Sequence, residues 1–99
     1  LQKEEKVEDP IKLNEDRLKD YFKDSFGDDR HYRCYQRLKE LGFSGQQAYN
    51  CANSRNTMNL FWKWLHDFGV MPKLSKGEVT KADAKQSFFR TLKENNLKI

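Results

Sequence analysis

Residues 44–65 read SGQQAYNCANSRNTMNLFWKWL, and this stretch carries most of the information about the fold. Ser44 can cap a short helix over Gly45–Cys51, and Asn53 or Ser54 can cap a longer helix after it. Small residues fall where these two helices would have to touch. The pattern therefore predicts two helices joined by a tight turn.

This layout resembles the helix-turn-helix of DNA-binding proteins, over about a fifth of the chain. In that motif Ala48 takes the position where the first helix packs closest to the second. Ala52 lies at the turn, where those proteins usually have glycine, and Met58 and Phe61 take the two apolar positions that anchor the second helix. The resemblance implies a domain that binds nucleic acid, duplex DNA in the first place.

The resemblance also implies which side chains would meet the DNA. The second helix would be the recognition helix in the major groove, with its first residues toward the bases. Guanidinium and amide groups there can pair with guanine or adenine edges, and basic residues further along and on the preceding helix can meet phosphates. The candidate residues for nucleic-acid binding are Arg55, Asn56, Thr57, Asn59, Lys63, Arg30, Arg33 and Arg37.

Charge is distributed unevenly along the 99 residues, whose formal net charge is +4. Ten acidic and six basic residues precede Arg30, whereas 13 basic and five acidic residues stand from there onward. A basic body behind an acidic lead suits a polyanionic partner. Arg30, Arg33 and Arg37 lie three and four residues apart, so they can grip phosphates or form a solvated face with ion pairs to Asp29 and Glu40.

Apolar residues at helical spacing predict further helices on both sides of this core, over residues 14–26, 29–41 and 81–95. We expect a compact all-α bundle of four to five short helices that contains a helix-turn-helix-like trihelical core. Residues 13–99 would form this single domain, and the charged residues 1–12 would be a flexible lead.

The longer helix, which is expected to end near Asp67, is apolar on two sides, so the first or the last helix must cover it. After it, Gly69 and Pro72 predict an extended loop or a small hairpin over Val70–Val79, and a hairpin there would be a short wing. Thr80 can cap the last helix. The predicted main stripe of the longer helix is Met58, Phe61, Trp62, Leu65 and Phe68, and its second apolar side is Leu60 and Trp64.

A second resemblance points to a protein-interaction module. Leu41–Ala48 followed by Phe61–Leu65 is similar to a ubiquitin-associated domain, in which a Gly-Phe loop follows the first helix and a Trp-Leu pair ends the third. It implies ubiquitin binding through Gly42, Phe43 and the last helix, or an adaptor role in a larger protein. The middle helix departs from that family, which has leucines where this chain has tyrosine, cysteine and alanine. An exposed Phe43 favours this interpretation, and a buried Phe43 favours the helix-turn-helix.

The sequence offers little for catalysis or metal binding. His31 and Cys34 can share a helical face, but no carboxylate at a distinctive spacing and no oxyanion element accompanies them. Cys34 and Cys51 lack CxxC spacing and form no zinc pattern with the two histidines. All five glycines are isolated, so no phosphate-cradling loop is present. We expect two buried thiols in a reducing compartment, and a non-enzyme without metal, cofactor or small-molecule substrate.

The chain has no apolar run of about 18 residues, so we expect no membrane span. No signal peptide is visible, which predicts an intracellular protein of the cytoplasm or nucleus. The chain begins at Leu1 rather than methionine, and we expect a domain of a longer protein or a processed product. Its predicted role is that of a regulator or an accessory in replication, transposition or packaging.

Overall fold

The computed structural model describes residues 15–99, and these residues form six helices and no strand. The prediction of an all-α domain is thereby confirmed. The predicted charged lead, and the start of the first helix at Asn14, lie outside the described residues. The helices are α1 (Glu15–Phe26), α2 (Arg30–Glu40), α3 (Gly45–Ala52), α4 (Arg55–Asp67), α5 (Val70–Ser75) and α6 (Lys81–Glu94).

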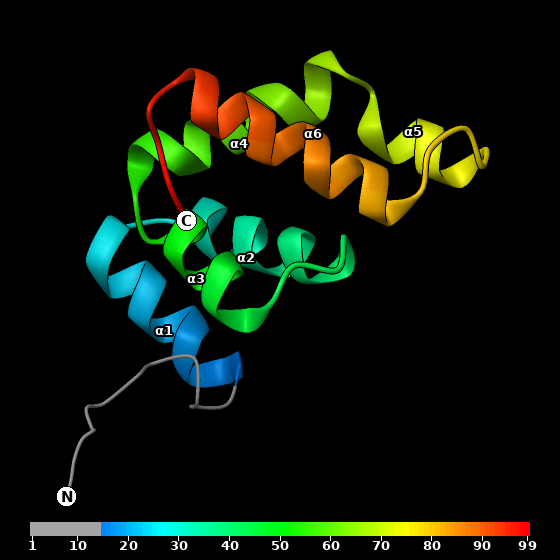
Figure 1. Ribbon diagram of the computed structural model, residues 1–99. Coiled ribbons are helices and arrows are strands. Elements are labelled where there is room, and N and C mark those ends of the chain that lie inside the picture. Colours follow the sequence, from blue (N-terminus) through cyan, green and yellow to red (C-terminus); the bar gives the residue numbers. More distant parts are fainter. Residues whose placement is uncertain (1–14) are drawn as a thin grey trace, which may run out of the picture.

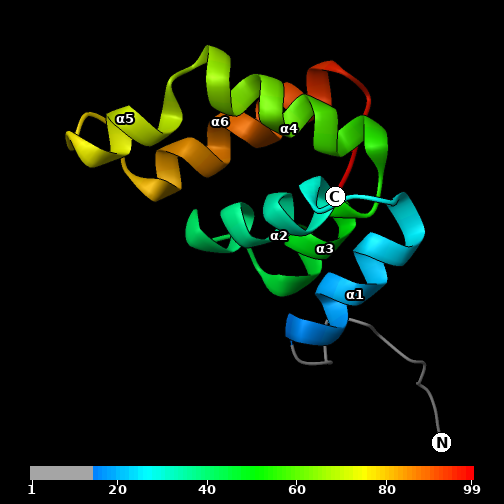
Figure 2. The same cartoon turned by 180° about the vertical axis from the view of Figure 1, so that it is seen from behind.

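The helices form two layers, with α1, α2 and α3 in one and α4, α5 and α6 in the other (Figure 1). Helix α2 packs on α1, α3 and α4, and helix α4 packs on α3, α5 and α6 as well. Seen from behind, α2 and α4 lie in front of α3 and α6 (Figure 2). The molecule therefore has an α2–α4 face and, on its opposite side, an α3–α6 face.

Helix α6 covers α4 on the side of Trp64. The rings of Phe61 and Trp64 lie 5.5 and 4.9 Å from the ring of Phe88 on α6, measured between centroids. The indole N–H of Trp64 donates to Ser87 Oγ at 3.0 Å, so its polar atom is satisfied in the core. The prediction that the first or the last helix must cover the second side is confirmed, and the last helix does so.

Two of the predicted caps close with both of their hydrogen bonds. Ser44 accepts from the backbone N–H of Gln47 and donates its own to Gln47 Oε1, each at 3.1 Å. Thr80 and Asp83 form the same reciprocal arrangement at the start of α6. Ser54 is the residue before α4, but its side chain makes no capping hydrogen bond. Ser44 and Thr80 were predicted as the caps of α3 and α6, and the structure contains their capping hydrogen bonds.

The expectation of a loop or a hairpin over Val70–Val79 is wrong, because α5 occupies Val70–Ser75. Gly69 adopts a left-handed conformation with φ of 58°, which turns the chain between α4 and α5. Pro72 is the third residue of α5, where a backbone N–H would have no acceptor within the helix, so proline is tolerated.

The predicted stripe of α4 is also partly wrong. Phe68 is the C-cap of α4 and is 51% exposed. Trp62 is only half-buried, whereas Trp64 is 2% exposed. Helix α6 approaches α4 on the side of Trp64, and this decides which of the two tryptophans enters the core.

Candidate nucleic-acid interface

The outer side of α4 carries an exposed polar stripe formed by Asn56, Asn59 and Lys63. These residues are three and four positions apart, so they share one side of the helix. The opposite side is fixed by Met58 and Phe61, both fully buried. The stripe is therefore held in place by the core, as a recognition surface requires.

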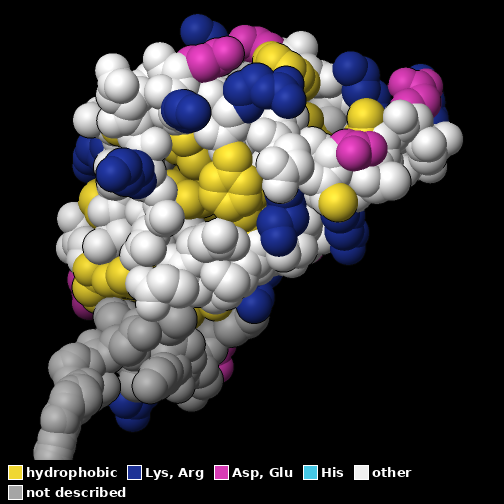
Figure 3. All heavy atoms as spheres, viewed as in Figure 1, with side chains coloured by type: hydrophobic (Ala, Val, Ile, Leu, Met, Phe, Trp, Pro, Cys, Tyr) yellow, Lys and Arg dark blue, Asp and Glu magenta, His cyan; other side chains and the backbone are white. Residues whose placement is uncertain are grey.

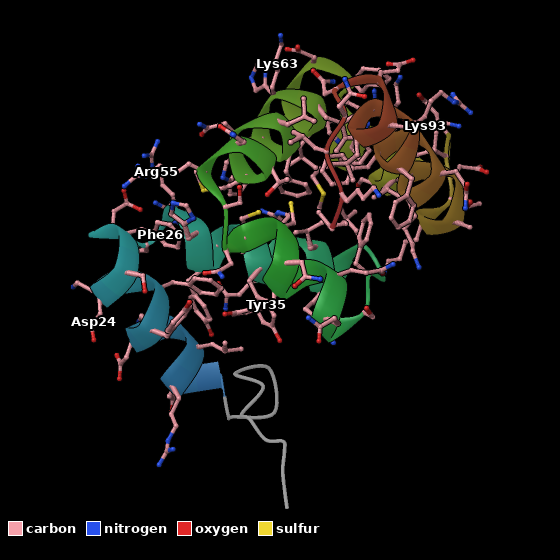
Figure 4. All side chains as sticks on the ribbon, turned by 60° about the vertical axis from the view of Figure 1, so that its left-hand side comes forward. Asp24, Phe26, Tyr35, Arg55, Lys63 and Lys93 are labelled. Carbon is pink, nitrogen blue, oxygen red and sulfur yellow. The ribbon has the colours of Figure 1, made fainter. Side chains whose placement is uncertain are left out.

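Arg55 stands at the start of α4 but engages α1. Its guanidinium donates to the backbone carbonyl of Phe26 at 3.4 Å and lies 5.6 Å from the centre of the Phe26 ring (Figure 4). A cation beside the last carbonyls of a helix is favourable. Arg55 thus links α1 to α4, and a base contact would require it to leave these partners.

Thr57 does not belong to the exposed surface, and its expected contact with nucleic acid is wrong. The side chain is 4% exposed, and its hydroxyl donates to the backbone carbonyl of Cys51 at 2.6 Å. A second carbonyl, that of Ser54, lies 3.3 Å from the same oxygen. These contacts close the turn between α3 and α4, so Thr57 has a structural role.

The three arginines of α2 differ in their surroundings. Arg37 pairs with Glu40 at 2.7 Å, and Arg30 pairs with Asp28 at 3.4 Å. Asp28 also accepts the backbone N–H of Arg30, which lowers the pKa of its carboxyl group. Arg33 is exposed and has no ion pair with any described residue. Exposed ion pairs are weak, so Arg30 and Arg37 can exchange theirs for phosphates, and Arg33 has no such pair within residues 15–99 to give up.

Trp62 connects the α2 arginines to the stripe on α4. Trp62 lines two hollows, one of about 350 Å³ beside α2 and one of about 750 Å³ beside α5. Its indole N–H is buried and has no hydrogen-bond partner among the described residues. The hollow toward α2 is lined by Arg33, Gln36, Arg37, Glu40 and Trp62.

The other border of the stripe is the end of α6 and the tail that follows it. Asn56, Asn59 and Lys63 share a hollow of about 410 Å³ with Asn95 and Leu97. The tail was not expected at this place, because its position depends on the packing of α6 against α4. The structure brings the predicted site residues together in two groups, Asn56, Asn59 and Lys63 around this hollow, and Arg33 and Arg37 around the hollow beside Trp62.

The opposite, α3–α6 face has a different chemistry. Hydrophobic side chains gather in its middle, with lysines and arginines around them (Figure 3). A hollow of about 530 Å³ lies there at the end of α6, and its apolar lining is Phe89, Leu92, Leu97 and Ile99. Amide side chains also lie on α3, where Gln46 donates to Asn50 at 2.9 Å, so this face is not devoid of polar groups.

The two residues considered for catalysis are buried. His31 is fully buried, stacks on Phe26 at 3.6 Å between ring centres, and its Nδ1 lies 2.6 Å from the carbonyl of Ala52. Burial raises the pKa of the Cys34 thiol far above its usual range, and a hydrogen bond with Cys51 adds to this. A neutral, inaccessible thiol is a poor nucleophile. The predicted burial of both cysteines is confirmed.

Phe43 is 2% exposed, and its ring packs against Phe88 and Phe89 at 5.9 and 5.5 Å between centroids. It is therefore not available as the exposed anchor that the ubiquitin-associated interpretation requires. The neighbouring Gly42 carbonyl accepts from Lys85 Nζ at 3.1 Å. The loop is thus tied to α6 at two points.

Within residues 15–99, no helix is long and apolar enough to cross a membrane. The same residues contain no group of three or more His, Cys, Asp or Glu side chains placed to hold a metal ion. No family model, curated protein or solved structure matches this chain.

Proposed function

We propose that this domain binds duplex DNA through its α2–α4 face, with α4 in the major groove. The observation that carries the proposal is the exposed stripe of Asn56, Asn59 and Lys63 on a helix whose other side is locked in the core. Asparagine amides pair with the N6 and N7 edge of adenine. A rigid helix that presents such groups in one row is the geometry of direct base readout.

The arginines of α2 would contribute the phosphate contacts. Arg33 and Arg37 lie beside Trp62, which is followed on α4 by Lys63, so cations border both of the hollows that Trp62 lines. Such cations fix the position of a protein on the duplex without reading its sequence. This division assigns readout to Asn56 and Asn59, and it assigns binding strength to Arg33, Arg37 and Lys63.

The proposed role of Arg55 is accordingly secondary. In the domain as it stands, its guanidinium is directed to Phe26 at the end of α1. Moving it to a base would break the hydrogen bond and the ring contact together. The readout residues begin with Asn56, one position further along α4.

The test is a titration with a fluorescent duplex at two salt concentrations. Binding should weaken steeply with salt, because each neutralised phosphate releases condensed counterions. Lys63→Ala should reduce the affinity for all sequences and lower the salt slope by about one.

Lys93→Ala is the matched control. Lys93 is an equally exposed lysine, but it lies on α6 and lines the hollow of the α3–α6 face (Figure 4). Its removal lowers the net charge by the same amount and should leave binding nearly unchanged. Equal losses for both variants would show that only overall charge attracts DNA, and binding that ignores salt would rule the proposal out.

A further inference from the structure

We propose that Trp62 is a stacking site for an unpaired nucleobase, and that the hollow between Trp62 and α2 takes a single-stranded segment of nucleic acid. The inference rests on the proposed function of the α2–α4 face and adds a second kind of ligand to it.

The first observation is the contrast between the two tryptophans of α4. Trp64 is buried and its N–H donates to Ser87 Oγ at 3.0 Å. Trp62, two residues earlier, is half-buried, and its N–H has no partner among the described residues. Tryptophan N–H groups away from water normally find an acceptor, because an unmade hydrogen bond is costly. The N–H of Trp62 is buried, so it is the exposed part of the ring, not this atom, that is open to a ligand.

The second observation is the space around the ring. Trp62 lines two hollows, of about 350 and 750 Å³. Leu65, Met71 and Pro72 give the second hollow an apolar wall. A planar, largely apolar group can therefore lie beside the indole, and every nucleobase offers such a planar surface.

The third observation is charge. Arg33 and Arg37 border the hollow beside α2 together with Glu40, and Lys63 borders the other hollow together with His66 and Asp67. Of these, Arg33 has no ion pair with the described residues, and the pair of Arg37 with Glu40 is exposed. In a single strand, phosphates alternate with bases, so cations beside both hollows can contact its phosphates while the aromatic ring stacks on a base. An acidic peptide would match the cations but makes no use of a flat ring with space beside it.

Fluorescence of Trp62 provides the test. The chain has two tryptophans, so Trp64→Phe leaves Trp62 as the only one. A single-stranded oligonucleotide of mixed sequence should quench this emission and shift the indole N–H resonance of Trp62 in the unsubstituted domain. The same measurements are made with the duplex, with a glutamate-rich peptide of equal charge, and with inorganic phosphate. The resonance in the unsubstituted domain keeps the test valid if Trp64→Phe unfolds the protein.

Variants of Trp62 give the second readout. Trp62→Leu should weaken binding of the single strand about tenfold or more, while Trp62→Phe, which keeps an aromatic ring, should retain most of it. Because the ring of Trp62 also packs against Phe61 at 5.2 Å between centroids, circular dichroism is used to verify that both variants are folded.

The outcomes separate this inference from the duplex proposal. One outcome is that the duplex binds with an affinity that falls in Lys63→Ala and is unchanged in Trp62→Leu, while no single strand binds. The stacking site is then wrong and the duplex proposal stands. If the single strand quenches Trp62 and the duplex does not bind, then the duplex proposal is wrong and the stacking site stands. A response to the peptide or to phosphate that equals the response to the single strand would overturn the stacking site, because neither carries a base.

Discussion

At the scale of single residues, the turn between α3 and α4 depends on Thr57. Its hydroxyl donates to the carbonyl of Cys51 at 2.6 Å inside the core. Thr57→Val keeps the shape of the side chain and removes the donor, so we expect the free energy of unfolding to fall by about 1–3 kcal/mol in urea denaturation.

Asn56→Ala, at the exposed position just before, is the control for Thr57→Val. It should change the free energy of unfolding by less than about 0.5 kcal/mol, because its side chain lies on the surface. Similar losses in the two variants would contradict the structural role of Thr57.

The exposed polar stripe on α4 could be predicted from the sequence, but the residues of other helices that adjoin it could not. Asn56, Asn59 and Lys63 are exposed because helical spacing places them opposite Met58 and Phe61, and spacing is visible in the sequence. Thr57 belongs to the same run of polar residues, but its hydroxyl donates to the backbone carbonyl of Cys51 and the side chain is buried. The neighbours of Trp62 and Arg55 come from α2 and α1, more than 20 positions away, and no local pattern contains that information.

At the scale of helices, two predicted capping residues with similar hydroxyl side chains differ in the capping hydrogen bonds that they form. Thr80 forms a reciprocal cap with Asp83, whereas Ser54 makes no capping hydrogen bond through its side chain. Thr80→Ala should lower the free energy of unfolding by about 0.5–2 kcal/mol, because it leaves a backbone donor of α6 without its acceptor. Ser54→Ala should cost less than about 0.5 kcal/mol in the same thermal or urea unfolding experiment. The opposite order would mean that α4, rather than α6, depends on its cap.

Five of the six helices could be predicted from their stripes and caps, and α5 could not. Gly69 and Pro72 are signals that end helices, and in α4 they do so correctly. They are also compatible with a new helix that starts at once, because glycine permits the left-handed turn and proline fits a first turn. Which outcome occurs depends on the burial of Val70, at 4% exposure, and hence on the tertiary fold.

At the scale of the whole molecule, Phe88 joins the two layers. Its ring contacts Phe61 and Trp64 of α4, and it also contacts Phe43 in the loop after α2. Phe88→Ala should lower the free energy of unfolding by about 3–5 kcal/mol, through lost contacts and a cavity between the layers.

Phe89→Ala is the matched control, since its ring is only half-buried and contacts Phe43 alone among the aromatic rings of the described part. It should cost clearly less in the same denaturation experiment. If Phe88→Ala proved as mild as Phe89→Ala, the two layers would not share one core.

The stack at the junction of α1, α2 and α4 has a consequence for spectroscopy. The ring of Phe26 on α1 contacts both the ring of His31 on α2 and the guanidinium of Arg55 on α4. Aromatic ring currents displace the proton resonances of nearby groups, so the signals of these three side chains report the distance between their helices. Separation of α4 from α1 would return the Arg55 methylene signals to ordinary positions while those of His31 stayed displaced. The domain therefore contains its own probe for which pair of helices opens first when a ligand binds or when denaturant is added.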